Sequence, residues 1–254
     1  MKLLTLARDL QRRRARERQR LFVVEGVRSV EELLRSRLAV QGAVVGPALA
    51  TTPRGEALRA SLAASGVATL EVDERDFASA ASTESPQGVL AIARIPEHDL
   101  ASLTVPTHAR ILVLDGIQDP GNVGTLARTA AAFGVAVTLA MPGTVDLWNG
   151  KVVRSAMGAL FHHPALSCTW DELHRFLAAS AIPLWGADAG GEELDAIQRP
   201  FPPRMAIVVG NEGAGLSREA TTRLARTVAI RTCADVESLN VAVAAGILLH
   251  YFQT

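Results

Sequence analysis

The chain has 254 residues, of which 48% are hydrophobic, and its basic and acidic residues balance to a net charge of zero. This length allows one or two domains with sizeable hydrophobic cores, and zero net charge excludes a uniformly basic protein, so nucleic-acid binding would need a local patch. Cys168 and Cys233 are too few for a disulfide scaffold, and the first eight residues are too short and too soon charged for a secretory signal. We therefore expect a cytoplasmic protein.

The first twenty residues form such a basic patch. Eight lysines and arginines against two acidic residues give this segment a net charge of +6. The segment is predicted to be helical, with early leucines followed by arginines on several faces. It could be a solvated amphipathic helix or an arm that contacts phosphates, and both interpretations stay open. The arginines proposed as RNA contacts are Arg12, Arg13, Arg16 and Arg20, together with Arg28 farther along the chain.

Apolar runs alternate with amphipathic segments over residues 21–95, which is typical of α/β structure. The short apolar runs predict strands, and apolar residues at helical spacing, such as Val30 and Leu33, predict helices. Strands are expected at 21–26, 39–46, 67–73 and 89–95, and helices at 27–37, 54–66 and 74–82. With the basic helix, these elements predict a first domain over residues 1–95, followed by a proline-framed linker at 96–106.

Residues 107–254 repeat this alternation and predict a second α/β domain. Strands are expected at 109–117, 135–141, 182–188, 205–210 and 227–232, and helices at 125–134, 148–166, 170–179 and 218–226. His162 and His163 fall within the second of these helices. No histidine or cysteine lies at a spacing from them that is typical of a metal site, so no metal is expected.

The last predicted helix, residues 239–252, is apolar on nearly every face. A helix without a polar face must be covered on all sides, so it belongs in the interior or at a subunit interface. It is too short to span a bilayer, and no membrane is expected. A polar stretch, 231–238, precedes it, and Ser238 and Asn240 lie where its first backbone N–H groups are unpaired. These side chains could cap the helix or help to form a ligand pocket, and this stretch alone does not decide.

Polar residues follow two of the predicted buried strands. Residues 122–124 (Asn-Val-Gly) follow the strand at 109–117, and Glu212 lies in the glycine-rich sequence NEGAGLS after the strand at 205–210. Open α/β sheets bind ligands at the carboxyl ends of their strands, and glycines let the backbone approach a ligand closely. Neither segment is a GxGxxG motif or a P-loop, so the usual nucleotide-binding motifs are absent from the sequence.

Three stretches resemble, in order and spacing, the three motifs of the SpoU (TrmH) family of RNA ribose 2'-O-methyltransferases in the SPOUT superfamily: NVGTLARTA, VVGNEGAGLS and IRTCADVESLNVAVAAGILL. This resemblance covers the second domain. VVEGVRSVEELLRS and SPQGVLAIA resemble the amino-terminal RNA-binding domain of the rRNA-modifying branch. The implied fold is a small α/β RNA-binding domain followed by a carboxyl-terminal α/β domain tied in a trefoil knot, an exception to the rule of unknotted chains.

The resemblance also implies a cofactor, S-adenosylmethionine, and a homodimer in which the last helix packs across a two-fold axis. The residues expected at the cofactor are Val209, Gly210, Ile230, Ser238 and Leu239. The residues expected at the reacting ribose are Arg128 as the catalytic residue, with Asn122, Glu212, Ser238 and Asn240. A guanidinium is effectively never deprotonated. Arg128 would therefore either act with an RNA phosphate as the base or orient the ribose and stabilise its developing alkoxide.

The leading prediction is an enzyme that methylates a ribose 2'-hydroxyl of 23S rRNA. A tRNA substrate is one alternative, disfavoured because the tRNA branch of the family usually lacks such an amino-terminal domain. A non-catalytic RNA-binding or ribosome-assembly factor is another, and the presence of Asn122, Arg128, Glu212 and Asn240 argues against it. The motifs offer neither the aromatic stack nor the catalytic cysteine that base methylation commonly uses, which favours the ribose as the methyl acceptor.

Overall fold

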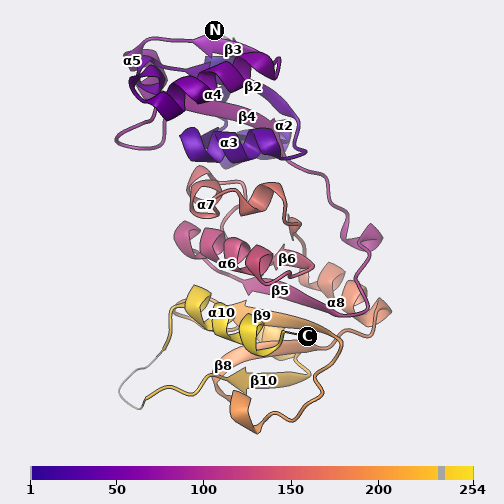
Figure 1. Cartoon of the computed structure of the whole chain (residues 1–254). Helices are drawn as coiled ribbons and strands as arrows, with labels where there is room; N and C mark the ends of the chain where they lie inside the picture. Colours follow the sequence, from indigo (N-terminus) through magenta and orange to yellow (C-terminus); the bar gives the residue numbers. More distant parts are fainter. Residues whose placement is uncertain (1, 234–237, 254) are drawn as a thin grey trace. The chain divides into compact units, whose positions relative to one another are not determined.

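In the computed structural model, which describes residues 2–233 and 238–253, the chain forms two compact units. Unit 1 consists of Met1–Glu97 with Trp148–His162, and unit 2 consists of His98–Leu147 with His163–Thr254. Each unit is built on its own sheet, and Figure 1 follows the chain through both. The predicted α/β architecture, with one sheet in each half of the chain, is confirmed. The segment 148–162 departs from the predicted boundaries, because it was expected in the second domain.

Unit 1 contains one mixed sheet. Its strands are β1 (Leu21–Glu25), β2 (Val40–Val45), β3 (Thr69–Glu71) and β4 (Val89–Arg94), and its helices are α1 (Lys2–Asp9), α2 (Arg13–Gln19), α3 (Val27–Arg35), α4 (Pro53–Ala64), α5 (Glu74–Ala78) and α7 (Gly150–Ser155). Among the described residues, four strands lie in the order β1-β4-β2-β3. β4 pairs antiparallel with both β1 and β2, and this central place explains why its apolar run is buried without alternation.

The basic amino-terminal segment is two helices, α1 and α2, rather than the single helix predicted. Arg16 in α2 is buried, and its Nη1 donates hydrogen bonds to the carbonyl oxygens of Leu10 at 2.8 Å and Gln11 at 2.9 Å. These carbonyls follow the end of α1, where a helix lacks its own donors, so the guanidinium satisfies them. A buried side chain cannot reach a phosphate, and Arg16 is therefore removed from the proposed RNA contacts.

Residues 148–166 do not form the single long helix predicted from the sequence. The α-helix α7 is short and is followed by one 3-10 turn at Ala159–Phe161. Met157 and Gly158, with φ angles of 51° and 89°, adopt left-handed conformations between the two. A left-handed residue ends an α-helix, which explains the interruption.

The same segment packs against β1. The ring centroid of Phe22 lies 4.5 Å from that of Trp148 and 6.1 Å from that of Phe161. At the end of β1, the buried carboxylate of Glu25 lies 3.8 Å from Nη1 of Arg154. Large aromatic rings contribute much of the apolar area in a core, so this segment completes the hydrophobic core of unit 1.

Unit 2 contains a parallel sheet. Its strands are β5 (Ala109–Asp115), β6 (Val137–Ala140), β7 (Ala165–Ser167), β8 (Leu184–Glu193), β9 (Arg204–Gly210) and β10 (Arg226–Ala229), and its helices are α6 (Pro120–Ala132), α8 (Trp170–Ala179), α9 (Arg218–Thr221) and α10 (Val241–Tyr251). The six strands of the described chain lie in the order β10-β8-β9-β5-β6-β7, with every neighbouring pair parallel. Asp115 pairs with Gly210, so β5 and β9 end together at one edge.

α6 begins five residues before its predicted start. Asp119 precedes it, and its Oδ1 accepts a hydrogen bond from the backbone N–H of Asn122 at 2.7 Å. Pro120 occupies the first helical position, where its missing N–H costs nothing. Asn122 therefore lies in the first turn of α6 and not, as predicted, in a turn that precedes the helix.

The apolar helix α10 packs against α6 and β9 within unit 2 (Figure 1). Its inner face is buried, whereas Val243 and Ile247 are 52% and 38% exposed. The chain itself thus covers only one face of this helix. None of the helices in the described ranges is both long and apolar enough to cross a membrane. The knotted path that the resemblance implies concerns this carboxyl-terminal segment, of which residues 234–237 lie outside the described residues.

His163 belongs to the core of unit 2. Its Nε2 lies 2.8 Å from the hydroxyl of Thr138, and desolvation by burial, with a smaller contribution from His98, lowers the pKa of the imidazole to about 4. The ring is therefore neutral near pH 7. Within residues 2–233 and 238–253, no group of three or more histidine, cysteine, aspartate or glutamate side chains could hold a metal ion.

Candidate active site

A cavity of about 670 Å³ lies in unit 2 beside the carboxyl ends of β9 and β10, the middle of β8 and the start of α10. This volume is within the usual range for small-molecule sites. Its lining includes all five residues predicted at the cofactor: Val209, Gly210, Ile230, Ser238 and Leu239. The predicted position at the carboxyl edge of a parallel sheet agrees with this placement.

The glycine-rich turn after β9 forms one wall of the cavity. Asn211 and Gly215 exchange backbone hydrogen bonds of 2.9 and 3.0 Å, which closes the turn. The side-chain oxygen of Asn211 also accepts from the backbone N–H groups of Gly213 at 3.0 Å and Ala214 at 2.9 Å. A Cβ on Gly210 would lie within 2.5 Å of the backbone nitrogen of Leu216, so only glycine fits before this turn.

Three predicted residues from separate parts of the chain meet beside this wall. Nδ2 of Asn122 donates to Oε1 of Glu212 at 3.0 Å, and Nδ2 of Asn240 donates to Oδ1 of Asn122 at 3.0 Å. Glu212 and Asn240 line the cavity, whereas Asn122 joins them from the first turn of α6. This hydrogen-bonded chain fixes the start of α6, the turn after β9 and the start of α10 relative to one another.

Glu212 is held as a carboxylate. Partial burial acts to raise its pKa, but hydrogen bonds from Asn122, from its own backbone and from the backbone N–H groups of Gln118 and Asp119 outweigh that effect and lower it. Those last two donors lie 3.4 Å from its oxygens. An ionised carboxylate only accepts hydrogen bonds. Glu212 is therefore suited to orient amides and other donors, and not to deliver a proton at neutral pH.

Asn240 has one of the roles that the sequence left open, and it also lines the cavity. It caps α10, because its Oδ1 accepts from the backbone N–H groups of Ala242 at 2.9 Å and Val243 at 3.3 Å. Its Nδ2 is then directed to Asn122. Ser238 is exposed and lines the cavity, and the residues that precede it in the polar stretch, 234–237, lie outside the described residues.

Arg128 does not line the cavity. It is exposed on α6, six residues beyond Asn122, which at about 1.5 Å per residue places it about 9 Å along the helix. Among the residues that the structure describes, none forms a hydrogen bond or ion pair with its guanidinium. Its charge is thus available to a ligand that reaches from the start of α6 over its exposed face.

The arginines proposed as RNA contacts lie in unit 1. Arg12 pairs with Asp9, and Arg13 donates to Glu17 at 2.7 Å. Both pairs are exposed, and such pairs contribute little to stability, so a phosphate could compete for these arginines. Arg20 and Arg28 are also exposed.

Several residues at the site were not identified as functional from the sequence. Asn211, Asp188 and Thr232 also line the cavity, and the buried Asp115 accepts from the backbone N–H of Ser217 at 2.6 Å. Asp188 and Thr232 could have been found, because each ends or follows a predicted strand. The sequence gives no such signal for Asp115, whose partner is a hundred residues away.

Both parts of the chain match models of known protein families. Residues 109–250 match the model of the SpoU rRNA Methylase family, and residues 5–91 match the MRM3-like substrate binding domain. A Bacillus subtilis relative, 23S rRNA (guanosine(2553)-2'-O)-methyltransferase RlmP, is 32% identical over 97% of this chain and 94% of its own length.

Two solved structures have the same fold along almost the whole chain. The SpoU methyltransferase AviRb from Streptomyces viridochromogenes, in complex with AdoMet, has a TM-score of 0.87 at 25% identity, over 99% of this chain and 97% of that one. An AdoMet-bound rRNA methyltransferase from Sinorhizobium meliloti has a TM-score of 0.85 at 26% identity, over 98% and 93%. With the family model covering more than half of its residues, this chain belongs to the SpoU rRNA methylase family.

Proposed function

We propose that this protein transfers a methyl group from S-adenosylmethionine to a ribose 2'-hydroxyl of 23S rRNA. The observation that carries the proposal is the hydrogen-bonded chain Glu212–Asn122–Asn240, which adjoins a cavity at the carboxyl edge of the parallel sheet. The names of the relatives point to rRNA, and the match to a substrate binding domain over residues 5–91 favours it over tRNA. Ribosomal RNA also makes the cytoplasm the expected compartment.

The cavity fits S-adenosylmethionine. Its lining combines apolar side chains, such as Val228 and Leu239, with backbone groups of three strands and the carboxylate of Asp188. Apolar surface suits the adenine ring, and the carboxylate suits a hydroxyl or ammonium group of the ligand. Gly210 lets the backbone of Gly215 and Leu216 approach closely, so backbone atoms form part of this wall beside the side chains of Asn211 and Glu212. When bound, the cofactor supplies a methyl group on a positively charged sulfur.

Arg128 and the hydrogen-bonded chain Glu212–Asn122–Asn240 have different roles at the ribose. The ribose oxygen must be aligned with the methyl carbon, and it gains negative charge as its proton leaves. A guanidinium stays charged, so Arg128 orients the ribose or its phosphate and stabilises that oxygen. Asn122 and Asn240, fixed by Glu212, shape the wall against which the ribose lies. The proton passes to solvent or to an RNA phosphate.

Turnover on defined RNAs tests this function. Unmodified 23S rRNA transcribed in vitro should acquire label from methyl-tritiated S-adenosylmethionine, and tRNA transcripts at the same concentration should acquire little. A non-catalytic assembly factor would bind 23S rRNA without labelling it, and label on tRNA alone would point to the alternative substrate.

The arginines of unit 1 are proposed to hold the RNA. Arg12, Arg13, Arg20 and Arg28 are exposed, and phosphate contacts from such residues supply affinity that is independent of sequence. In this proposal residues 1–95 bind the substrate, 96–106 link the domains, and 107–254 bind the cofactor. The segment 148–162 belongs to the proposed cofactor-binding range in sequence, but it contributes to the core of unit 1.

A homodimer through α10 is proposed from its exposed apolar face. Val243 and Ile247 lie one turn apart and are among the large hydrophobic side chains that the described chain leaves exposed. A two-fold contact would bury the same face on both subunits.

Light scattering is expected to report twice the chain mass of 26.9 kDa, and Ile247→Asp should shift the protein toward one chain mass. The reason is that a charge buried in an apolar interface costs several kcal/mol, on the order of the association energy itself. Ala178→Asp on the exposed face of α8 serves as the matched control and should remain dimeric. A wild-type chain that is monomeric at micromolar concentration would refute the interface.

A further inference from the structure

Unit 1 contains a second recess, of whose lining residues only Arg28 has so far been assigned a role, as an RNA contact. Its volume is about 160 Å³, the space of about five waters, so it can admit one planar ring and not a folded ligand. Three segments line it: α3 contributes Arg28, Ser29 and Glu32, the start of α4 contributes Arg54, and Met157 follows α7.

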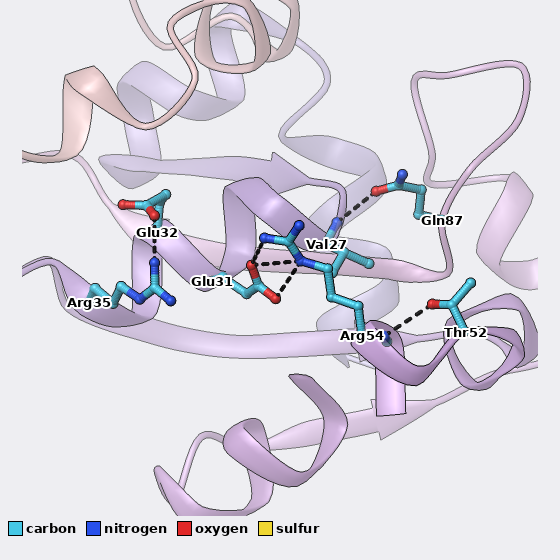
Figure 2. Close-up of polar contacts among 8 residues, drawn as sticks. Val27, Glu31, Glu32, Arg35, Thr52, Arg54 and Gln87 are labelled. Carbon is cyan, nitrogen blue, oxygen red and sulfur yellow. Dashed lines mark hydrogen bonds and ion pairs between the residues drawn. The ribbon is translucent and has the colours of Figure 1, made fainter. Parts of the chain in front are cut away.

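The charges around this recess are unevenly paired. Nε of Arg54 donates to Oε1 of Glu31 at 2.9 Å, and this hydrogen bond is the main cause of the lowered pKa of Glu31 (Figure 2). Arg35 donates to Oε1 of Glu32 at 2.8 Å. Arg28 has no hydrogen-bonding or ion-pair partner among the described residues, and neither does Oε2 of Glu32. Arg28 interacts with Glu31, and Glu32 with Arg54, through charge alone. A donor and an acceptor without a hydrogen-bond partner among the described residues therefore border the same recess.

Arg28 and Glu32 lie four residues apart on α3, a spacing at which opposite charges commonly pair. Here they do not pair, since no nitrogen of Arg28 lies within 4.0 Å of a Glu32 oxygen in this part of the described chain. Both side chains line the recess. A ligand that offers an acceptor to Arg28 and a donor to Glu32 would satisfy both at once.

Met157 supplies an apolar surface to this recess. Its side chain is 49% exposed, although its backbone has a left-handed φ of 51° that is unfavourable for a residue with a side chain. The neighbouring Gly158 packs closely against α3, because a Cβ there would lie 3.0 Å from Cβ of Glu32. A thioether makes favourable contacts with aromatic rings. The fold thus holds a polarisable group at the recess instead of burying it.

We propose that this recess receives one unstacked base of the RNA substrate, stacked against Met157, with Arg28 donating to a base acceptor and Glu32 accepting from a base donor. Guanine fits this pair best, because its O6 and N7 offer two adjacent acceptors to a guanidinium and its N1–H and N2–H groups offer two adjacent donors to a carboxylate. Sequence-specific recognition of RNA depends on such splayed-out bases. The inference rests on the proposed function, because it takes RNA to be the substrate.

A phosphate fits the recess less well than a base does. Glu32 would repel it, and Arg54 is already held by Glu31. The first backbone N–H of α3, on Val27, donates to Oε1 of Gln87 at 2.8 Å, so it is not free to bind an anion (Figure 2). Thr52 accepts from the backbone N–H of Gly55 at 3.1 Å and caps α4 in the same way.

The test follows the methyl group of Met157 by NMR. Full-length protein carrying 13C-methyl methionine is saturated with S-adenosylhomocysteine, which fills the larger cavity, and is titrated with GMP, CMP, UMP or inorganic phosphate. The Met157 signal, assigned with Met157→Leu, should move upfield with GMP, since a stacked ring shields a methyl group above its face. The signals of Met141 and Met205, both buried, should stay in place.

Matched variants distinguish recognition of a base in the recess from a general effect of positive charge on nucleotide binding. Arg28→Gln should weaken the GMP titration about tenfold, and Glu32→Gln should remove the preference for GMP over CMP. Arg59 on α4 forms an exposed ion pair with Glu71. Arg59→Gln removes one positive charge there and should change neither the GMP titration nor the preference for GMP over CMP. In turnover assays Arg28→Gln should raise the KM for RNA about tenfold and leave the KM for S-adenosylmethionine unchanged.

The inference is overturned if no nucleotide moves the Met157 signal, or if inorganic phosphate moves it equally, which would indicate an anion site. Neither result would affect methyl transfer to 23S rRNA by the wild-type protein. Conversely, an inactive wild type that still shows the GMP shift would refute the proposed function and retain the recess as a base-binding site.

Discussion

Arg128→Ala is expected to reduce methyl transfer by at least about 100-fold, the usual effect of removing a donor that stabilises a developing oxyanion. Arg128 is exposed on α6, does not line the cavity, and pairs with no residue of the described chain. Its loss should therefore leave the fold intact and the affinity for S-adenosylmethionine within a few-fold. Single-turnover rates measure the first effect, and calorimetry with the cofactor measures the second.

Two further variants define what Arg128 contributes. Arg128→Lys keeps the charge but loses the planar pair of donors, so activity between those of wild type and Arg128→Ala is expected. Arg175→Ala on the exposed face of α8 removes the same charge elsewhere in unit 2 and should be fully active. Near-normal turnover by Arg128→Ala would exclude Arg128 as the catalytic residue.

Gly210→Ala is expected to weaken S-adenosylmethionine binding at least tenfold, with a corresponding loss of activity. The added Cβ would meet the backbone of Gly215 and Leu216, and backbone atoms within a closed turn cannot move aside as a flexible side chain can. Overpacking of this kind typically costs about 1–3 kcal/mol, and about 1.4 kcal/mol corresponds to tenfold in affinity. The turn after β9 should open and deform the wall of the cavity.

Gly213→Ala is the matched control in the same turn. A Cβ at Gly213 would have its nearest neighbour, Oδ1 of Asn211, at an ordinary 3.8 Å, and the residue has no left-handed φ. This variant should bind the cofactor as the wild type does. Equal affinities for Gly210→Ala and Gly213→Ala, with both proteins folded by circular dichroism, would contradict the placement of the cofactor against this turn.

Much of the fold could be predicted from the sequence because its signals are local. The buried run of β9 and the alternation of strands and helices in both units follow from apolar patterns alone. The predicted start of α6 was wrong, although the sequence contains a short-range signal for it. Asp119 followed by Pro120 is a strong start signal for α6, and it places Asn122 inside the helix.

Other features could not be predicted because they depend on residues that are distant along the chain. The bond between Asn122 and Glu212 joins positions 90 residues apart, and no spacing rule brings them together. Nor does the pattern of residues 148–162 indicate that Trp148 would pack on Phe22 of the first sheet. Nothing in the sequence distinguishes Arg16 from the exposed arginines beside it. Its burial is explained only by the break between α1 and α2, where it binds the carbonyl oxygen of Leu10.

Alkaline hydrolysis shows directly whether the methyl group is placed on a ribose oxygen. Alkaline cleavage of RNA uses the 2'-hydroxyl as its nucleophile, so a 2'-O-methylated position resists cleavage. Unmodified 23S rRNA treated with the enzyme and S-adenosylmethionine should therefore show one gap in its alkaline hydrolysis ladder, absent when Arg128→Ala replaces the wild type. Label recovered on a base, with an unbroken ladder, would show that the ribose oxygen is not the methyl acceptor.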